Sequence, residues 1–205
     1  MKKFRNKYRI ETTRLRHWDY GWNAAYFVTI CTRDRVCFFG RVTNGKMMLN
    51  DLGLIAEKCW LEIPEHFPFV ELGNHVVMPN HVHGIVIINK PDDGRAGKPN
   101  GVVVVETQNF ASLQQQPPPE MDPPKNRFGP QSQNLASIIR GYKTGVTKQA
   151  RLICPDFAWQ SRYYDHIIPD NGSFERIARY IQNNPAQWQA DEWHNNNPKK
   201  TNAEK

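Results

Sequence analysis

The chain has 205 residues, of which 39% are hydrophobic and 23% charged, a size and composition typical of one globular domain. No run approaches the roughly 18 apolar residues of a membrane span, and the basic N-terminus is not followed by an apolar segment. We therefore expect a cytoplasmic protein that does not act at a membrane. The four cysteines contain no CxxC pair, which argues against a thiolate zinc site and a disulfide framework.

The positive charge is concentrated at the N-terminus. The formal net charge is +7, and residues 1–46 contain 11 Lys or Arg against 3 Asp or Glu. We expect residues 1–19 to form a basic arm, in which Arg14 and Arg16 are candidates for contacts with the phosphates of a nucleic acid. A solvated tail that binds nothing is the alternative interpretation.

The first half of the chain alternates between strand and helix patterns. Residues 25–32 are β-branched and aromatic, which predicts a strand. The Asn44-Gly45 step predicts a tight hairpin over residues 41–49. After Asn50, which is a good N-cap, apolar residues recur at helical spacing as far as Pro64.

Two further apolar runs, 69–78 and 81–88, flank Pro79-Asn80 and predict either two adjacent strands or one kinked strand. Residues 89–134 contain eight of the fifteen prolines, so we predict a long, mostly unstructured insertion there. A polar tail over residues 191–205 would follow a catalytic domain that spans residues 20–190.

Ordered structure should resume with a helix over residues 132–151 and an aromatic segment over 157–168. A last helix is predicted from Ser173 to Asn184, stopped by Pro185. This order of elements predicts an α+β fold, in which helices pack on an antiparallel sheet.

His81 and His83 lie two residues apart in a strand-like run, and the period of two places both imidazoles on one face. Neutral imidazoles bind divalent metals, so this pair and one oxygen ligand could form an open metal site. Two ordinary sheet histidines are the alternative. We place His75 outside the site, although a zinc site of three histidines remains a minor alternative.

The last helix offers a second group of polar residues. Tyr180 lies at the margin of its apolar stripe, and Asn184 follows one turn later. A hydroxyl at such a margin can face a cleft, although a half-buried packing tyrosine is the commoner case.

Together these residues resemble the single-tyrosine HUH transposases, and among them the REP-associated tyrosine transposases. The resemblance covers about residues 20–188 and rests on three blocks in their order: VVMPNHVHGIV at 76–86, WQSRYYDHII at 159–168 and RYIQNNP at 179–185. It implies a ferredoxin-like antiparallel sheet with helices packed on one face. The second block is interpreted mainly as structural support around the site.

The resemblance also implies a chemistry. His81, His83 and Asn184 would bind Mg²⁺ or Mn²⁺, and Tyr180 would attack a DNA phosphate to form a 5′-phosphotyrosine link. Single-stranded or hairpin DNA would be the substrate of a transposase that is associated with the nucleoid and acts as a monomer or a homodimer.

Three further basic residues are candidates for backbone phosphate contacts, namely Arg140, Lys143 and Arg162. Two other functions stay open at this stage. One is a domesticated hairpin-DNA-binding protein without catalysis, and the other is a nuclease in which water attacks and Tyr180 only packs.

Overall fold

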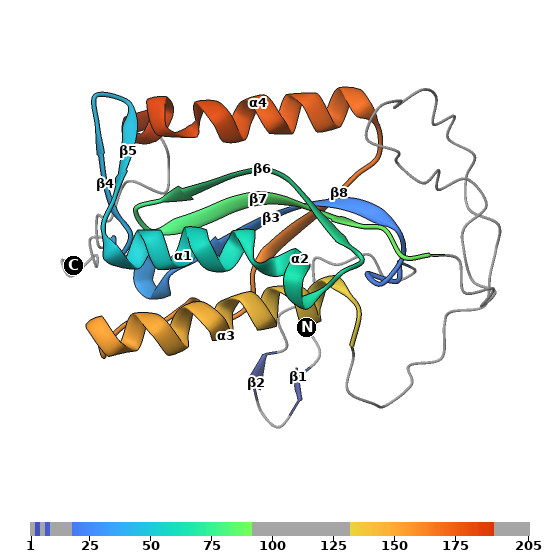
Figure 1. Ribbon diagram of the computed structural model, residues 1–205, viewed down its shortest axis with the longest axis horizontal. Coiled ribbons are helices and arrows are strands. Elements are labelled where there is room, and N and C mark those ends of the chain that lie inside the picture. The colour runs from blue at the N-terminus through green and yellow to red at the C-terminus, as the bar shows by residue number, and fades with distance from the viewer. Residues whose placement is uncertain (1–2, 5–6, 9–17, 92–131, 191–205) are drawn as a thin grey trace.

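A four-stranded antiparallel sheet forms the centre of the molecule (Figure 1), shown in a computed structural model that describes residues 3–4, 7–8, 18–91 and 132–190. The strand order is β6-β7-β3-β8, and every neighbouring pair is antiparallel. The four strands are β3 (Ala24–Cys31), β6 (Val70–Met78), β7 (His81–Ile88) and β8 (Tyr164–Ile168).

Three long helices cover this sheet, namely α1 (Asp51–Leu61), α3 (Leu135–Ile153) and α4 (Asn171–Gln187). Helix α1 connects β3 to β6 and α3 connects β7 to β8, which with the strand order is the ferredoxin-like arrangement. The smaller elements are β1 (Lys3–Phe4), β2 (Lys7–Tyr8), η1 (Arg33–Arg35), β4 (Gly40–Thr43), β5 (Lys46–Leu49), α2 (Ile63–His66) and η2 (Trp188–Ala190).

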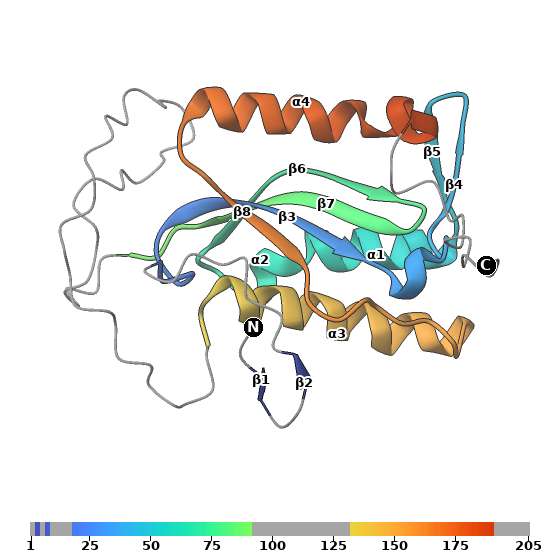
Figure 2. The ribbon, with the colours of Figure 1, turned by 180° about the vertical axis from the view of Figure 1, so that it is seen from behind.

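The helices lie on both faces of the sheet. Helices α1 and α3 cover one face and α4 covers the other, as Figures 1 and 2 show from opposite sides. The predicted antiparallel sheet with helices packed on it is confirmed, but the expectation that the helices occupy one face is wrong for α4. The physical reason is visible in β7, where all eight residues are buried and both sets of alternating side chains therefore need a cover.

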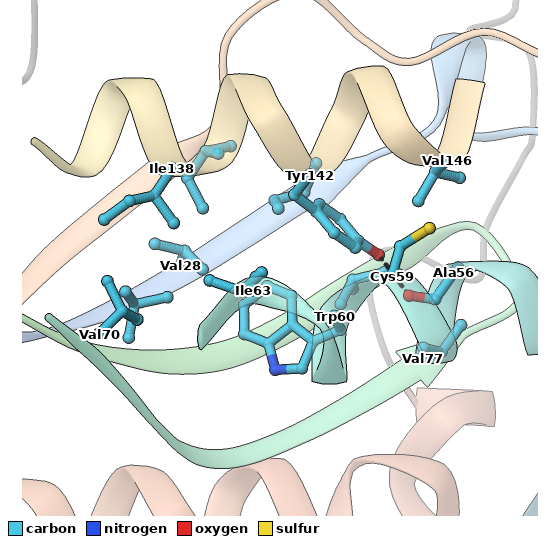
Figure 3. Packing of buried hydrophobic residues seen from close by; sticks show 14 of the residues in the cluster. Val28, Ala56, Cys59, Trp60, Ile63, Val70, Val77, Ile138, Tyr142 and Val146 are labelled. Atoms are coloured by element: carbon cyan, nitrogen blue, oxygen red, sulfur yellow. Dashed lines mark hydrogen bonds between the residues drawn. The ribbon is translucent and has the colours of Figure 1, made fainter. Parts of the chain in front are cut away.

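The main core lies between the sheet and the pair α1 and α3 (Figure 3). Trp60 is fully buried there, and its ring meets the Tyr142 ring edge-on with centroids 5.3 Å apart. The Tyr142 hydroxyl donates a hydrogen bond to the Ala56 carbonyl over 3.2 Å, which satisfies a polar group that burial would otherwise penalise.

The local signals in the sequence act as predicted in the first half of the chain. Asn50 caps α1 by accepting a hydrogen bond from the Gly53 N–H over 3.0 Å. Asn44 and Gly45, with φ of 52° and 70°, form the turn of the β4-β5 hairpin. Pro79 and Asn80 connect two adjacent antiparallel strands, β6 and β7, rather than kinking a single one.

The boundaries of the last helix differ from the prediction. Asp170, and not Ser173, is the N-cap, because its carboxylate accepts the Ser173 N–H over 2.8 Å. Pro185 lies inside α4 and does not stop it, since the helix continues to Gln187 and buried Trp188 follows in η2. Packing of this C-terminal turn outweighs the hydrogen bond that proline cannot donate.

Several predictions concern residues outside the described part of the chain. These are the phosphate contacts of Arg14 and Arg16, most of the insertion at 89–134 and the tail at 191–205. Within the described ranges no helix is both long and apolar enough to cross a membrane.

Candidate active site

The two histidines of β7 lie side by side on the face of the sheet that α4 covers. Their ring centroids are 4.4 Å apart, and both side chains are buried. Further along the same strand, Ile85 and Ile87 pack against Ile181 of α4 and continue this face as apolar core. His75 lies on β6 and stacks on Trp60 in the opposite layer, so its predicted place outside the site is confirmed.

Asn80 determines the orientation of His81. Its amide nitrogen donates to the Arg35 carbonyl over 3.1 Å, which places its oxygen 2.8 Å from His81 Nδ1. Because this oxygen can only accept a hydrogen bond, the proton of neutral His81 resides on Nδ1 and the lone pair on Nε2. This is the tautomer that a metal ligand requires.

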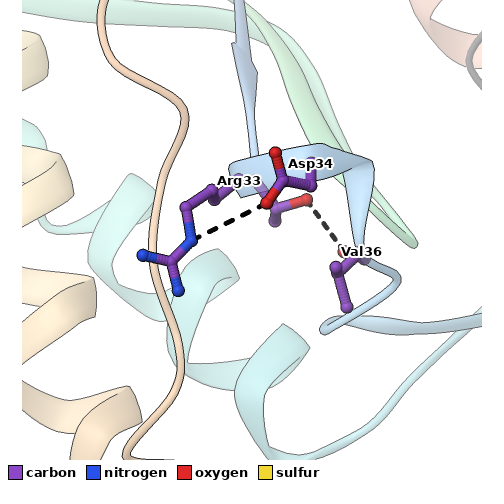
Figure 4. Close-up of polar contacts among 4 residues, drawn as sticks. Arg33, Asp34 and Val36 are labelled. Atoms are coloured by element: carbon purple, nitrogen blue, oxygen red, sulfur yellow. Dashed lines mark hydrogen bonds and ion pairs between the residues drawn. The ribbon is translucent and has the colours of Figure 1, made fainter.

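The turn that follows β3 contacts Asn80, and Figure 4 shows the polar contacts within this turn. The Val36 N–H donates to the Arg33 carbonyl over 3.2 Å, and the Arg33 guanidinium lies 4.0 Å from the Asp34 carboxylate. Asp34 and Arg35 have φ of 54° and 56°, in the left-handed region that most residues avoid. This unusual turn presents the Arg35 carbonyl to Asn80.

His83 is held in the same manner by β3. Its Nδ1 lies 2.8 Å from Thr29 Oγ1, and its Nε2 lies 3.3 Å from the Tyr180 hydroxyl. If the hydroxyl donates to Nε2, then Nδ1 carries the proton and donates to Thr29. These contacts connect three elements, because Thr29 lies on β3, His83 on β7 and Tyr180 on α4.

Burial keeps both imidazoles neutral. Desolvation lowers the pKa of His83 to about 3 from an ordinary value of 6.5. Desolvation also lowers the pKa of His81 well below its ordinary value, and the nearby His83 and Arg35 act in the same direction. The Asn184 side chain opposes this shift at His81, which places the amide beside that ring.

Helix α4 brings Tyr180 and Asn184 to the histidines, one turn apart on the same side. Tyr180 is 39% exposed, whereas Asn184 is 1% exposed. Asn184 Oδ1 could accept a hydrogen bond from His81 only if Nε2 were protonated, and with neutral His81 this buried oxygen has no hydrogen-bond partner among the described residues. That is unfavourable unless a ligand supplies a partner.

These donors fit a divalent metal ion. Two neutral imidazoles with hydrogen-bonded Nδ1 atoms suit divalent transition metals, and the buried amide oxygen is the kind of ligand that Mn²⁺ and Mg²⁺ prefer. In the described ranges no three His, Cys, Asp or Glu residues gather at a site that could hold a metal. The ligand set therefore depends on the asparagine.

Sequence reasoning missed four residues that support this site. Thr29 and Asn80 orient the histidines, the Phe27 ring stacks 5.3 Å from His83, and Trp188 lies 6.0 Å from His81. Asn80 precedes His81 in the chain and could have been suspected from that position. Thr29, Phe27 and Trp188 carry no local signal, since only the strand register and the end of α4 bring them close.

The three predicted phosphate contacts Arg140, Lys143 and Arg162 line one groove between α3 and the segment before β8. Lys148 and Arg151 also line it, and none of its lining residues is acidic. The Lys143 ammonium donates to the carbonyls of Gln160 and Arg162 over 2.7 and 2.9 Å, so it also secures this segment. The groove lies beside α3, and hence on the other side of the sheet from Tyr180.

Comparisons with known proteins agree with this architecture. A protein of Haemophilus influenzae described as uncharacterized is 38% identical over 180 residues, which cover 87% of this chain and 89% of the relative. The structure of a REP-associated tyrosine transposase bound to a REP hairpin matches with a TM-score of 0.51 and 16% identity, over 86% of this chain and 74% of the other. No family model matches the chain.

Proposed function

The chain belongs to one family with the Haemophilus influenzae protein and has the fold of a REP-associated tyrosine transposase, and on these premises we propose that it is a transposase that cleaves and rejoins single-stranded DNA. The observation that carries the proposal is the 3.3 Å contact between the Tyr180 hydroxyl and Nε2 of a buried histidine. A tyrosine that only packs would have no need of a neutral, oriented histidine pair beside its hydroxyl.

In this proposal the Tyr180 oxygen attacks the phosphorus of one DNA phosphodiester. A new bond joins the tyrosine to the 5′-phosphate, the phenol gives up its proton, and the 3′-oxygen leaves as a hydroxyl. Attack by the 3′-hydroxyl of another strand reverses the step and releases Tyr180. Bond energy is conserved in the phosphotyrosine, so no nucleotide cofactor is required.

His81, His83 and Asn184 would hold Mg²⁺ or Mn²⁺, and the ion would supply charge stabilisation at the phosphate oxygens. At His83 the ion would use the Nε2 lone pair that the Tyr180 hydroxyl contacts in the metal-free protein. The chain's own contribution is positional. Asn80 and Thr29 orient the two imidazoles. Burial of the imidazoles favours their neutral form, which can bind a cation.

The related transposase structure contains a REP hairpin, and we propose hairpin DNA as the partner of this chain too. Five basic residues line the groove beside α3, which suits the phosphates of a DNA backbone. Of these, we propose Arg140, Lys143 and Arg162 as contacts, and Arg14 and Arg16 of the N-terminal arm as additional ones.

The test is formation of a covalent adduct. Purified protein would be incubated with labelled single-stranded hairpin oligonucleotides and Mn²⁺ or Mg²⁺ and separated on a denaturing gel. We expect a shifted band that Tyr180→Phe and His81→Ala abolish and that Glu175→Gln, an exposed change on the same helix, retains. Binding of hairpins without any adduct would favour a non-catalytic DNA-binding protein, and metal-dependent cutting without an adduct would favour a water-dependent nuclease.

A thermal-shift assay tests the metal site separately. Mn²⁺ should raise the melting temperature of the wild type, because an ion that binds only the folded state stabilises it by about 2.7 kcal/mol at 100 times its Kd. The shift should disappear in Asn184→Ala. An equal shift in that variant would exclude Asn184 as a ligand.

A further inference from the structure

One aromatic side chain beside the site has no role in the mechanism above. Tyr164 is the first residue of β8, which is an edge strand of the sheet, and it is 53% exposed. A large ring at such exposure contributes little to a core. The surrounding block of sequence predicts structural support, and the exposed ring of Tyr164 is an exception to that prediction.

The strand register places Tyr164 on the same face as the site. Tyr164 pairs with Thr29 on β3, and Thr29 pairs with His83 on β7. Directly paired residues of an antiparallel sheet point to the same face, so the three side chains form one row across the sheet. Thr29, in the middle, is the residue that contacts His83 Nδ1.

One ring separates Tyr164 from the proposed nucleophile. The centroid of Phe27 lies 6.4 Å from that of Tyr164 and 6.1 Å from that of Tyr180, and both contacts are edge-on. Aromatic surface therefore extends from the proposed nucleophile across Phe27 to the exposed edge of the sheet.

We propose that Tyr164 is a stacking platform for an unpaired nucleobase next to the phosphate that Tyr180 attacks. This inference rests on the proposed function and adds a binding contact to it. Rings stack on any base, and single strands are commonly bound through such contacts. A base in a duplex is stacked on its neighbours, so the platform would favour an unpaired substrate.

The segment that leads into Tyr164 is connected to α3 by a hydrogen bond. Arg162, two residues before Tyr164, has φ of 69°. The Lys143 ammonium of α3 donates a hydrogen bond to the Arg162 carbonyl over 2.9 Å. Tyr163, just before β8, lines the basic groove, while Tyr164 lies on the site face in register with Thr29 and His83. A strand of DNA that wraps this edge could place phosphates in the groove and a base on Tyr164.

The test combines Tyr164 variants with abasic DNA. Affinity would be measured by fluorescence anisotropy in EDTA, with oligonucleotides that lack one base at successive positions around the cleavage point. We expect Tyr164→Ala to weaken binding of the intact strand about 10-fold, within the range of roughly 5- to 150-fold for loss of one stacked base. Tyr164→Phe should bind as the wild type does.

The diagnostic result is non-additivity at one position. Removal of the stacked base should weaken the wild type by the same factor as Tyr164→Ala, and should have no further effect in that variant. Equal binding by wild type and Tyr164→Ala, or losses that multiply at every position, would overturn the proposal. Circular dichroism melting of each variant checks that the fold is unchanged.

The outcome is separable from that of the proposed function. Adduct formation by the wild type is measured separately, because it tests the chemistry at Tyr180 without any change at Tyr164. An adduct with fully additive abasic losses would reject the platform and leave the transposase proposal intact. Non-additive binding without an adduct in the wild type would reject the chemistry and support the platform.

Discussion

Strands β3 and β7 place different kinds of side chain on the two faces of the central sheet. On the face under α1 and α3, alternate residues of β3 and β7 such as Val28 and Val82 enter one apolar core. On the face under α4, the intervening residues are apolar at one end and polar at the other, where Thr29, His81 and His83 gather. The first face is covered by an apolar core, whereas the second combines an apolar part with a buried polar cluster.

The largest effect that would test this comparison is expected in the core. Trp60→Ala should lower the free energy of unfolding by about 3–5 kcal/mol, because a fully buried ring is removed and a cavity remains. Urea denaturation measures the change. Leu54→Ala, at an exposed position of the same helix, should stay within about 0.5 kcal/mol of the wild type. A loss below about 1 kcal/mol for Trp60→Ala would contradict the assignment of this face.

A second substitution overfills the same core from strand β7. Gly84 lies between His83 and Ile85, and a Cβ added there would overlap the Trp60 ring. We expect Gly84→Ala to cost about 1–3 kcal/mol through overpacking. Trp60→Phe removes the overlapping part of the indole, so in the double variant the two losses should be less than additive. Full additivity in urea denaturation would show that the ring does not restrict this position.

The histidines predict a pH dependence that the apolar face does not share. The pKa of His83 is lowered to about 3 in the folded protein from an ordinary value of 6.5. Between pH 3 and pH 6.5 the unfolded chain therefore binds more protons at this residue than the folded chain does. Stability should therefore fall with decreasing pH, by about 1.4 kcal/mol per unit below 6.5 for this one group. Thermal melting in EDTA would measure the slope, and His83→Gln should flatten it. An unchanged slope would mean that His83 titrates normally.

The smallest expected change is a gain in stability, in contrast to the losses predicted for the other substitutions. Asn184→Leu replaces a buried amide whose oxygen has no hydrogen-bond partner in the described residues by an apolar side chain of similar size. We expect the metal-free protein to gain about 1 kcal/mol, since the desolvation penalty is removed. Chemical denaturation without metal would show the gain, and adduct formation should be lost. A less stable variant would indicate that Asn184 is already satisfied in the fold.

Much of the fold could be predicted because its signals are local. The Asn44-Gly45 turn, the Asn50 cap and the alternation of His81 and His83 all depend on residues within one turn or strand. The exception is α4, where Pro185 suggested a stop. A helix end depends on what its last turn packs against, and buried Trp188 lies beyond the range of a local pattern.

The site could be predicted only in part for a related reason. Tyr180 and Asn184 were placed on one helix face, and the resemblance connected them with the histidine pair. That the Tyr180 hydroxyl lies 3.3 Å from His83 depends on the packing of α4 against the sheet. The supporting Thr29 is 54 residues away from His83 in the chain.

Most of the elements, the chemistry of the candidate ligands and the shared face of the two histidines could be predicted from the sequence, because periodicity and side-chain type are properties of short segments. The packed molecule was needed to see that α4 covers the face opposite α1 and α3, that Asn80 and Thr29 orient the imidazoles, and that burial keeps the imidazoles neutral. Strand register, helix docking and desolvation arise from contacts between segments far apart in the chain, so no local pattern encodes them.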